Sequence, residues 1–181
     1  MPKTKKRKKQ DKISAKLFGE IISSNSKKAL DLYGKSRFGE VKGGKIIYSF
    51  PEALYLVEEK KMEVKEGGKK LSFDKLINRL REIDKKIMIK YVVFRDLRKR
   101  GYIIKTALKF GAEFRVYDKG KKVGEEHAKW ILFPVSENSE LTWKDFSARN
   151  RIAHSTRKNL LIAVVDSEND VSYYEVTWLK P

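Results

Sequence analysis

Apolar positions in the first half of the chain recur at spacings that predict two helices separated by a short strand. The first helix begins at Ser49, because Ser49 followed by Glu52 is a capping box that satisfies free backbone N–H groups. The second begins after Ser72, and its apolar positions keep helical spacing at Phe73, Leu76, Ile77 and Leu80. Between them, residues 62–65 predict a strand that ends in a glycine turn.

The second half of the chain predicts a helix, three strands, a second helix and two strands. In chain order these elements are residues 87–100, 102–110, 112–116, 130–135, 142–157, 160–165 and 171–176. Gly101 is a C-terminal stop for the first helix, and polar and apolar residues then alternate as in half-buried strands. The unbroken apolar run from Trp130 to Val135 is typical of a strand that is buried on both faces.

This order of elements is typical of an α+β fold. The charge-rich stretch 81–86 separates the halves, so we expect a small N-terminal α/β unit over residues 13–86 and a C-terminal mixed-sheet unit with two helices over residues 87–181. Residues 1–12 carry seven Lys and Arg against Asp11 alone and have no apolar periodicity. They predict a disordered basic arm.

The charge of the chain favours a polyanionic partner. The 42 Lys and Arg exceed the 24 Asp and Glu, which gives a net charge of +18, and removing the net charge of six in the arm still leaves +12. Nucleic acid is the usual partner of so basic a protein, and a membrane surface is the rival. Since no apolar run approaches the roughly 20 residues of a membrane span and the first residues lack a secretion signal, we expect a soluble, cytoplasmic protein.

The absence of cysteine excludes disulfides, thiolate zinc sites and cysteine nucleophiles. The chain has two histidines, His127 and His154, which do not suffice for a zinc site built from nitrogen and sulfur ligands. We therefore expect no metal and no cofactor, and any hydrolytic chemistry must use other groups.

Three blocks of sequence carry more information than periodicity: DLRKRGY at residues 96–102, KFGAEFRVY at 109–117 and RIAHSTRK at 151–158. In this order they resemble the archaeal tRNA-splicing endonuclease family. The resemblance covers the whole second half and extends more weakly to residues 52–57 and 71–73. Ala107, where the family usually has glycine, and a polar stretch at residues 147–150 depart from the family pattern and leave the reactive positions intact.

The resemblance implies a catalytic group made of Tyr117, His127 and Lys158. RNA carries its own nucleophile, the 2′-hydroxyl, so cleavage needs one group to accept the 2′-OH proton, one to protonate the leaving 5′-oxygen and a cation to stabilise the phosphorane. His127 fits the general acid and Lys158 the cation. Tyr117 either takes the proton or orients the 2′-OH, and the sequence leaves both roles open. The products implied are a 2′,3′-cyclic phosphate and a 5′-hydroxyl.

The family resemblance also implies a substrate and an assembly. The substrate is precursor tRNA, whose intron junctions form two bulges around a short helix, and Arg151 and Trp178 are candidates to hold an extruded base. An acidic loop with Asp166, Glu168 and Asp170 is expected to join dimers into a homotetramer. A heterotetramer with a noncatalytic paralogue is the alternative assembly.

Simpler interpretations exist for each residue and for the whole chain. A strand tyrosine is ordinarily a core or rim residue, a loop histidine or a lysine is ordinarily solvated, Arg151 can be a surface cation of a helix, and His154 is expected to have a structural hydrogen-bonding role. The chain as a whole can instead be a noncatalytic RNA-binding or structural subunit, although the retention of Tyr117, His127 and Lys158 argues against this. A metal-dependent nuclease, the third hypothesis, predicts that EDTA abolishes cutting.

Overall fold

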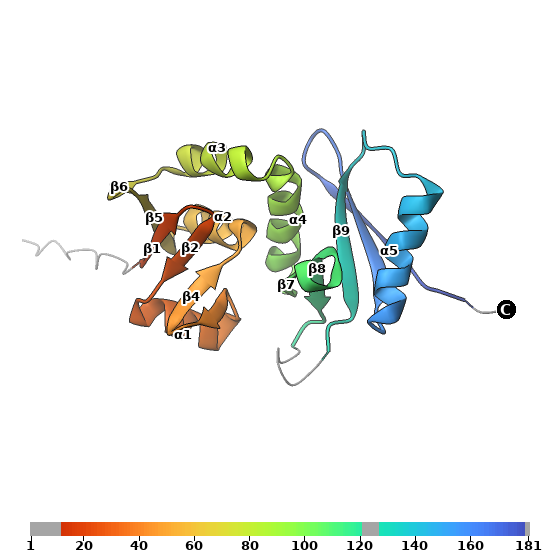
Figure 1. The fold of residues 1–181 in the computed structure, drawn as a ribbon, viewed down its shortest axis with the longest axis horizontal. Coiled ribbons are helices and arrows are strands. Elements are labelled where there is room, and N and C mark those ends of the chain that lie inside the picture. The colour runs from red at the N-terminus through yellow and green to blue at the C-terminus, as the bar shows by residue number, and fades with distance from the viewer. Residues whose placement is uncertain (1–11, 121–126, 180–181) are drawn as a thin grey trace, which may run out of the picture.

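The strands of the protein form two sheets in a computed structural model that describes residues 12–120 and 127–179 (Figure 1). The predicted basic arm lies outside these residues except for Lys12. In the first, six-stranded sheet the strands follow the order β3-β4-β2-β1-β5-β6. Its strands are β1 Ile13–Phe18, β2 Ile21–Ser24, β3 Glu40–Lys42, β4 Lys45–Tyr48, β5 Met62–Glu66 and β6 Lys69–Lys70. The helices of this half are α1 Lys27–Ser36, α2 Phe50–Glu58 and α3 Phe73–Ile83.

Both predicted helix starts of the first half are confirmed. Glu52 Oε2 accepts hydrogen bonds from the Ser49 backbone N–H at 3.0 Å and from the Ser49 hydroxyl at 2.9 Å. Ser72 Oγ accepts from the backbone N–H of Lys75 at 3.3 Å. These contacts satisfy N–H groups that a helix leaves unpaired at its beginning, which is why α2 and α3 start where they do.

The second sheet has five strands in the order β11-β10-β9-β8-β7. Its elements are α4 Ile87–Lys99, β7 Ile103–Ala107, β8 Ala112–Tyr117, β9 Trp130–Ser136, α5 Trp143–Ser155, β10 Asn159–Val165 and β11 Val171–Val176. Helices α4 and α5 cover opposite faces of this sheet (Figure 1). The unbroken apolar run is explained by this cover, because Trp130 and Leu132 pack in the core beside α4 while Ile131 packs in the core beside α5. The predicted α+β class and the order of elements from residue 87 onward are confirmed.

The predicted strand over residues 102–110 is too long. Strand β7 ends at Ala107, and Leu108–Phe110 form a 3-10 turn, η1. Ala107 pairs with Ala112 across the antiparallel hairpin, so the intervening residues must reverse the chain. Gly111 closes this turn with φ of 73° and donates its N–H to the Leu108 carbonyl at 3.0 Å. Leu108, which lies in this turn, is 72% exposed.

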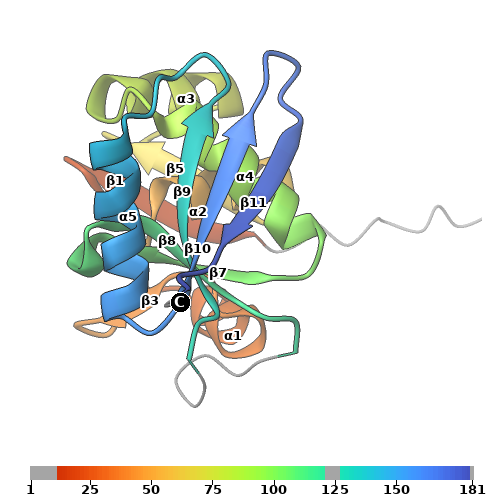
Figure 2. The ribbon, with the colours of Figure 1, turned by 90° about the vertical axis from the view of Figure 1, so that its right-hand side faces the viewer.

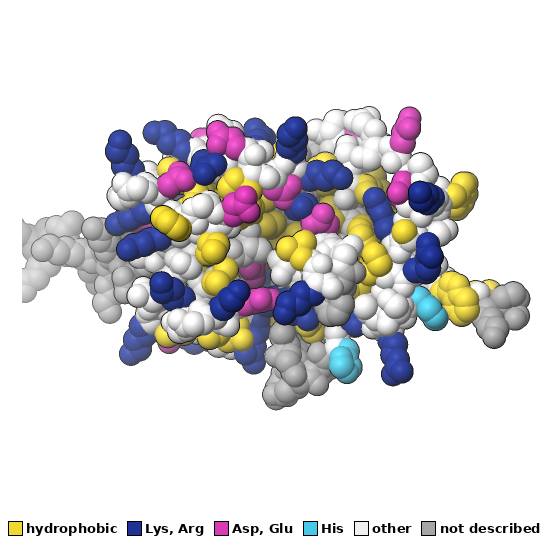
Figure 3. All heavy atoms as spheres, viewed as in Figure 1, with side chains coloured by type: hydrophobic (Ala, Val, Ile, Leu, Met, Phe, Trp, Pro, Cys, Tyr) yellow, Lys and Arg dark blue, Asp and Glu magenta, His cyan; other side chains and the backbone are white. Residues whose placement is uncertain are grey.

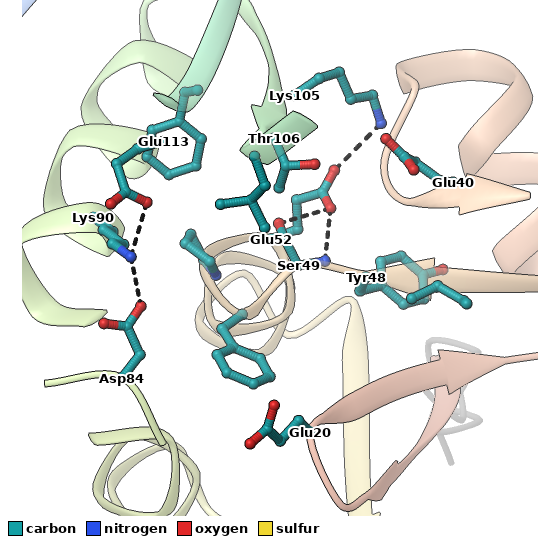
Figure 4. Close-up of a pocket in the computed structure, with 15 residues that line it drawn as sticks. Glu20, Glu40, Tyr48, Ser49, Glu52, Asp84, Lys90, Lys105, Thr106 and Glu113 are labelled. Atoms are coloured by element: carbon teal, nitrogen blue, oxygen red, sulfur yellow. Dashed lines mark hydrogen bonds and ion pairs between the residues drawn. The ribbon is translucent and has the colours of Figure 1, made fainter. Parts of the chain in front are cut away.

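A buried ion pair joins the first half of the chain to the second sheet (Figure 4). Lys105 of β7 lies 3.4 Å from Glu52 of α2 and donates to the Gly39 carbonyl at 2.6 Å, while the Gly39 N–H donates to Glu52 at 2.9 Å. Burial lowers the pKa of the Lys105 ammonium, although the nearby Glu52 carboxylate opposes this shift. Lys90 makes a second link, with 2.8 Å contacts to both Asp84 and Glu113.

Helix α4 packs against α2 as well as against the second sheet, and one apolar core runs from Ile13 to Val165. The division of the chain between residues 86 and 87 therefore stays a prediction. Within the described residues, no helix is long and apolar enough to cross a membrane.

Candidate active site

Three chain segments meet at one end of the second sheet. Strand β8 ends at Tyr117, and Val116 pairs with Trp130, the first residue of the antiparallel strand β9. Trp130 also pairs with Asn159, the first residue of β10, which runs parallel to β9. His127 lies three residues before β9 and Lys158 lies one residue before β10. The strand register therefore brings the three predicted reactive residues to the same end of the sheet.

Tyr117 is a buried residue, with 4% of its surface exposed. The guanidinium of Arg115, two residues earlier on the same face of β8, lies 5.9 Å from the centroid of its ring. The Nε of Arg115 is buried and has no hydrogen-bond partner in the described part of the chain. A buried, unpartnered guanidinium nitrogen beside a tyrosine is a ready hydrogen-bond donor for an anion.

Lys158 is placed by the turn that follows α5. Arg157 adopts the left-handed conformation with φ of 55°, and the Lys158 N–H donates to the Ala153 carbonyl at 2.9 Å. The Lys158 ammonium donates to the Thr156 carbonyl at 2.6 Å. Burial, and next the positive charge of Arg115, lower the pKa of this ammonium. Arg115 is thus an electrostatic neighbour of both Tyr117 and Lys158.

His127 is exposed and directly follows residues 121–126, which lie outside the described residues. No hydrogen bond or ion pair joins the side chains of Tyr117, His127 and Lys158, all three of which the structure describes. The structure brings these residues to one end of the sheet without a hydrogen bond or an ion pair between their side chains. Groups that each act on a different atom of a phosphodiester do not need to touch one another.

Arg151 and Trp178, the predicted RNA contacts, line one cavity of about 340 Å³ beside α5. The Trp178 side chain is 56% exposed and its ring lies 4.6 Å from the ring of His154. His154 is therefore placed against an aromatic ring, and among the described residues its side chain makes none of the hydrogen bonds predicted for it. A neighbouring cavity of about 230 Å³ is lined by Lys158, His154 and Trp178, which connects the predicted base-binding residues to the end of the sheet.

Two family models match this chain. The tRNA intron endonuclease, catalytic C-terminal domain, matches residues 87–173, and the tRNA intron endonuclease, N-terminal domain, matches residues 13–77. The chain belongs to the tRNA intron endonuclease family. The resemblance seen in the sequence blocks is thereby confirmed.

Curated relatives of this member of the tRNA intron endonuclease family match it over more than nine tenths of its length. A tRNA-splicing endonuclease from Thermococcus onnurineus is 46% identical over 172 residues, which are 94% of this chain and 99% of the relative. That of Thermococcus kodakarensis is 46% identical over 91% of this chain and 96% of the relative. The enzyme of Methanothermobacter thermautotrophicus is 37% identical over 94% of this chain and 99% of its own length.

The acidic loop of this family member is the turn between β10 and β11. One carboxylate oxygen of Asp166 accepts from the backbone N–H groups of Glu168 at 2.9 Å and Asp170 at 2.8 Å. The Ser167 N–H donates to Glu137 at 2.7 Å, which ties the turn to the end of β9. Asp166 therefore holds the shape of the loop, and Glu168 and Asp170 are the exposed carboxylates that a partner can reach.

Arg115 is the functional candidate that the sequence analysis missed. It lies inside the block at residues 109–117, two positions before Tyr117, and strand periodicity puts both side chains on one face of β8. That periodicity was the available signal, because it places a cation beside a predicted reactive residue.

Proposed function

We propose that this protein is a tRNA-splicing endonuclease that cuts precursor tRNA at its intron–exon junctions. The observation that carries the proposal is the match to enzymes of that name over nearly the full length of both chains. The strand register supports it, because it gathers Tyr117, His127 and Lys158 from three segments at one end of the second sheet.

The proposed reaction is an internal transesterification. The 2′-oxygen forms a bond to phosphorus as its proton leaves, and the bond from phosphorus to the 5′-oxygen breaks as that oxygen gains a proton. His127 supplies the second proton, and the Lys158 ammonium stabilises the extra negative charge on the phosphorane. Tyr117 accepts the 2′-OH proton or orients the hydroxyl. The products are a 2′,3′-cyclic phosphate and a 5′-hydroxyl, and no step needs a metal ion.

The cavity beside α5 is proposed to hold a base that is extruded from a bulge at the junction. An unpaired base can stack on the Trp178 ring, which is half exposed, and on the Arg151 guanidinium, since both residues line this cavity. Since every base has a flat face, such stacking recognises the bulge rather than its sequence.

Wild-type protein should cut a bulge-helix-bulge RNA equally fast in excess EDTA and in buffer with Mg²⁺, because the proposed acid, base and cation are all side chains. The rates are measured under single-turnover conditions. The 5′-hydroxyl end is identified because a kinase phosphorylates it without prior phosphate removal, and the 2′,3′-cyclic phosphate end because it resists ligation until the phosphate is removed. The control is the same RNA without bulges. Loss of cutting in EDTA that Mg²⁺ restores would reject this mechanism in favour of a metal-dependent nuclease.

We propose that the protein acts in the cytoplasm as a homotetramer held by the acidic loop. A groove of about 710 Å³ between β3 of the first sheet and β7 and β8 of the second has basic walls that include Arg37, Lys109 and Arg115. The exposed Glu168 and Asp170 of a second copy complement this charge. A partner loop in the groove would lie near Arg115, and so near the reactive end of the sheet.

The purified protein should elute with a mass about four times its 21.1 kDa. The variant Glu168→Lys/Asp170→Lys should elute as a smaller species, since like charges would then face each other in the groove. Glu137→Lys is not a suitable control because Glu137 supports the loop. Glu140→Lys/Glu175→Gln adds charge elsewhere on the second half and should leave the mass unchanged. A wild-type protein that elutes as a monomer or dimer, and reaches four chains only with another protein, would indicate the heterotetramer.

A further inference from the structure

Five lysines line one cavity of about 540 Å³ at the side of the first sheet. We call it the lysine groove, and its lysines are Lys27, Lys28, Lys35, Lys60 and Lys61. The remaining lining residues are Ile13, Leu32 and a single acid, Asp31. Among the described residues, Lys61 is the only one of the five lysines paired with a carboxylate, 3.7 Å from Glu59. The groove therefore concentrates positive charge, most of which has no carboxylate partner among the described residues.

The start of helix α1 adds to this charge. Helix N-termini carry a partial positive charge and favour acidic side chains, but the first turn of α1 has none and begins with Lys27 and Lys28. The Ser26 hydroxyl caps the helix by accepting from the Ala29 N–H at 3.3 Å. Two lysines beside a helix N-terminus are repelled by one another and by the partial positive charge of the helix end. A bound anion would be attracted by all three charges and would make the arrangement favourable.

We propose that the lysine groove is a second RNA-binding site, which holds the phosphate backbone of the substrate at a distance from the cleaved bond. None of the described residues that line the groove is aromatic, so it offers charge without base stacking and fits a sugar-phosphate backbone in any sequence. It begins at Ile13, directly after the seven Lys and Arg of residues 1–12. The proposal rests on the proposed function for the identity of the RNA.

The position of α1 suits a long substrate. Helix α1 and the end of the second sheet where β8 leads toward β9 both lie along the lower edge of the molecule in Figure 1, and Figure 2 shows the same relation from the side. Lys and Arg side chains are frequent along this edge over α1 (Figure 3). A precursor tRNA cut at the sheet end can therefore extend along α1, whereas a minimal bulge-helix-bulge RNA is too short to need this contact.

The test compares two triple variants that lose the same charge. Lys27→Gln/Lys28→Gln/Lys60→Gln removes charge from the lysine groove, and Lys69→Gln/Lys75→Gln/Lys85→Gln removes it from exposed positions around α3. The RNA is a precursor tRNA with 2′-deoxy nucleotides at both junctions, which cannot form the cyclic phosphate, and its affinity is measured over a range of KCl concentrations. A minimal bulge-helix-bulge RNA with the same deoxy positions is the second ligand.

The groove variant should bind the precursor tRNA about 10-fold more weakly than wild type at moderate salt. The slope of its plot of log affinity against log salt should be shallower by about 2 to 3, because each of the three lost phosphate contacts lowers the slope by about 0.7 to 0.9. Its affinity for the minimal RNA and the mass of its assembly should not change. Equal weakening by both triple variants, no weakening by either, or a changed assembly mass in the groove variant would overturn the proposal. Because binding is measured without cleavage, this outcome is independent of whether wild-type protein cuts the unmodified RNA.

Discussion

Replacing His127 with alanine should slow the cleavage of a bulge-helix-bulge RNA by about 100- to 10,000-fold, the range typical for the loss of a general acid or base. The side chain is exposed at the reactive end of the sheet and, among the described residues, has no hydrogen bond or ion pair with Tyr117 or Lys158, so its removal should not disturb the fold. The RNA affinity should change little, because the proton is needed in the transition state rather than in the bound substrate. Single-turnover rates at saturating protein measure this effect directly.

A substrate with sulfur in place of the bridging 5′-oxygen separates the role of His127 from that of a base. A thiolate leaves without being protonated, so His127→Ala should cut this substrate at nearly the wild-type rate if His127 is the general acid. The other histidine gives the control: His154→Ala should affect RNA affinity rather than the rate of the bound complex, since its ring packs on Trp178. Wild-type rates in His127→Ala on the natural substrate would remove His127 from the mechanism.

The sequence predicted the second half of the fold well because local and long-range signals agree there. The run from Trp130 to Val135 is apolar throughout because α4 and α5 cover both faces of the sheet, and Thr142 caps α5 by accepting from the Asp145 N–H at 3.1 Å. The resemblance in the three blocks pointed to the same family that the comparisons then identified.

The first 48 residues were left without predicted elements, although they contain four strands and α1. Strand β1 has the required alternation, with Ile13, Ala15 and Leu17 buried and the residues between them exposed, but it is only six residues long. It pairs in parallel with β5, some 50 residues away in the chain, and no local pattern specifies such a partner. At residues 108–110 the apolar alternation continued past the true end of β7, because hairpin closure overrides it there.

The candidate site was accessible to sequence reasoning only in part. The family resemblance of the three sequence blocks suggested Tyr117, His127 and Lys158, and the pairing of β8, β9 and β10 explains how positions 117 and 158 reach one end of the sheet. Arg115 was missed because an arginine in a strand is ordinarily solvated, and its influence on Lys158 depends on a fold that brings together two residues more than 40 positions apart in the chain.

Replacing Lys158 with alanine should lower the rate of the bound complex by about 100- to 1,000-fold, the loss expected when one preorganised donor to a developing oxyanion is removed. The ammonium is held by the Thr156 carbonyl at 2.6 Å, so the protein fixes its position before RNA binds. Lys119→Ala is the matched control, because Lys119 is an exposed lysine two residues after Tyr117, over the Tyr102 ring at 5.0 Å. It should stay within a few-fold of wild type, and equal losses in both variants would show that Lys158 contributes only general charge.

The pH dependence of kcat/KM tests the same ammonium in the free protein. Burial and the charge of Arg115 lower its pKa, so the ammonium loses its proton at a lower pH than an ordinary lysine, and kcat/KM should fall correspondingly early on the alkaline side. In Arg115→Gln one of these two causes is absent, the pKa of Lys158 rises, and the alkaline fall should move to higher pH whatever happens to the maximal rate. In Lys158→Arg the fall due to this group should vanish from the accessible range, since a guanidinium keeps its proton there. If kcat/KM falls at the same alkaline pH in all three proteins, another group causes the fall. The loss of the Lys158 proton would then not be what limits the reaction.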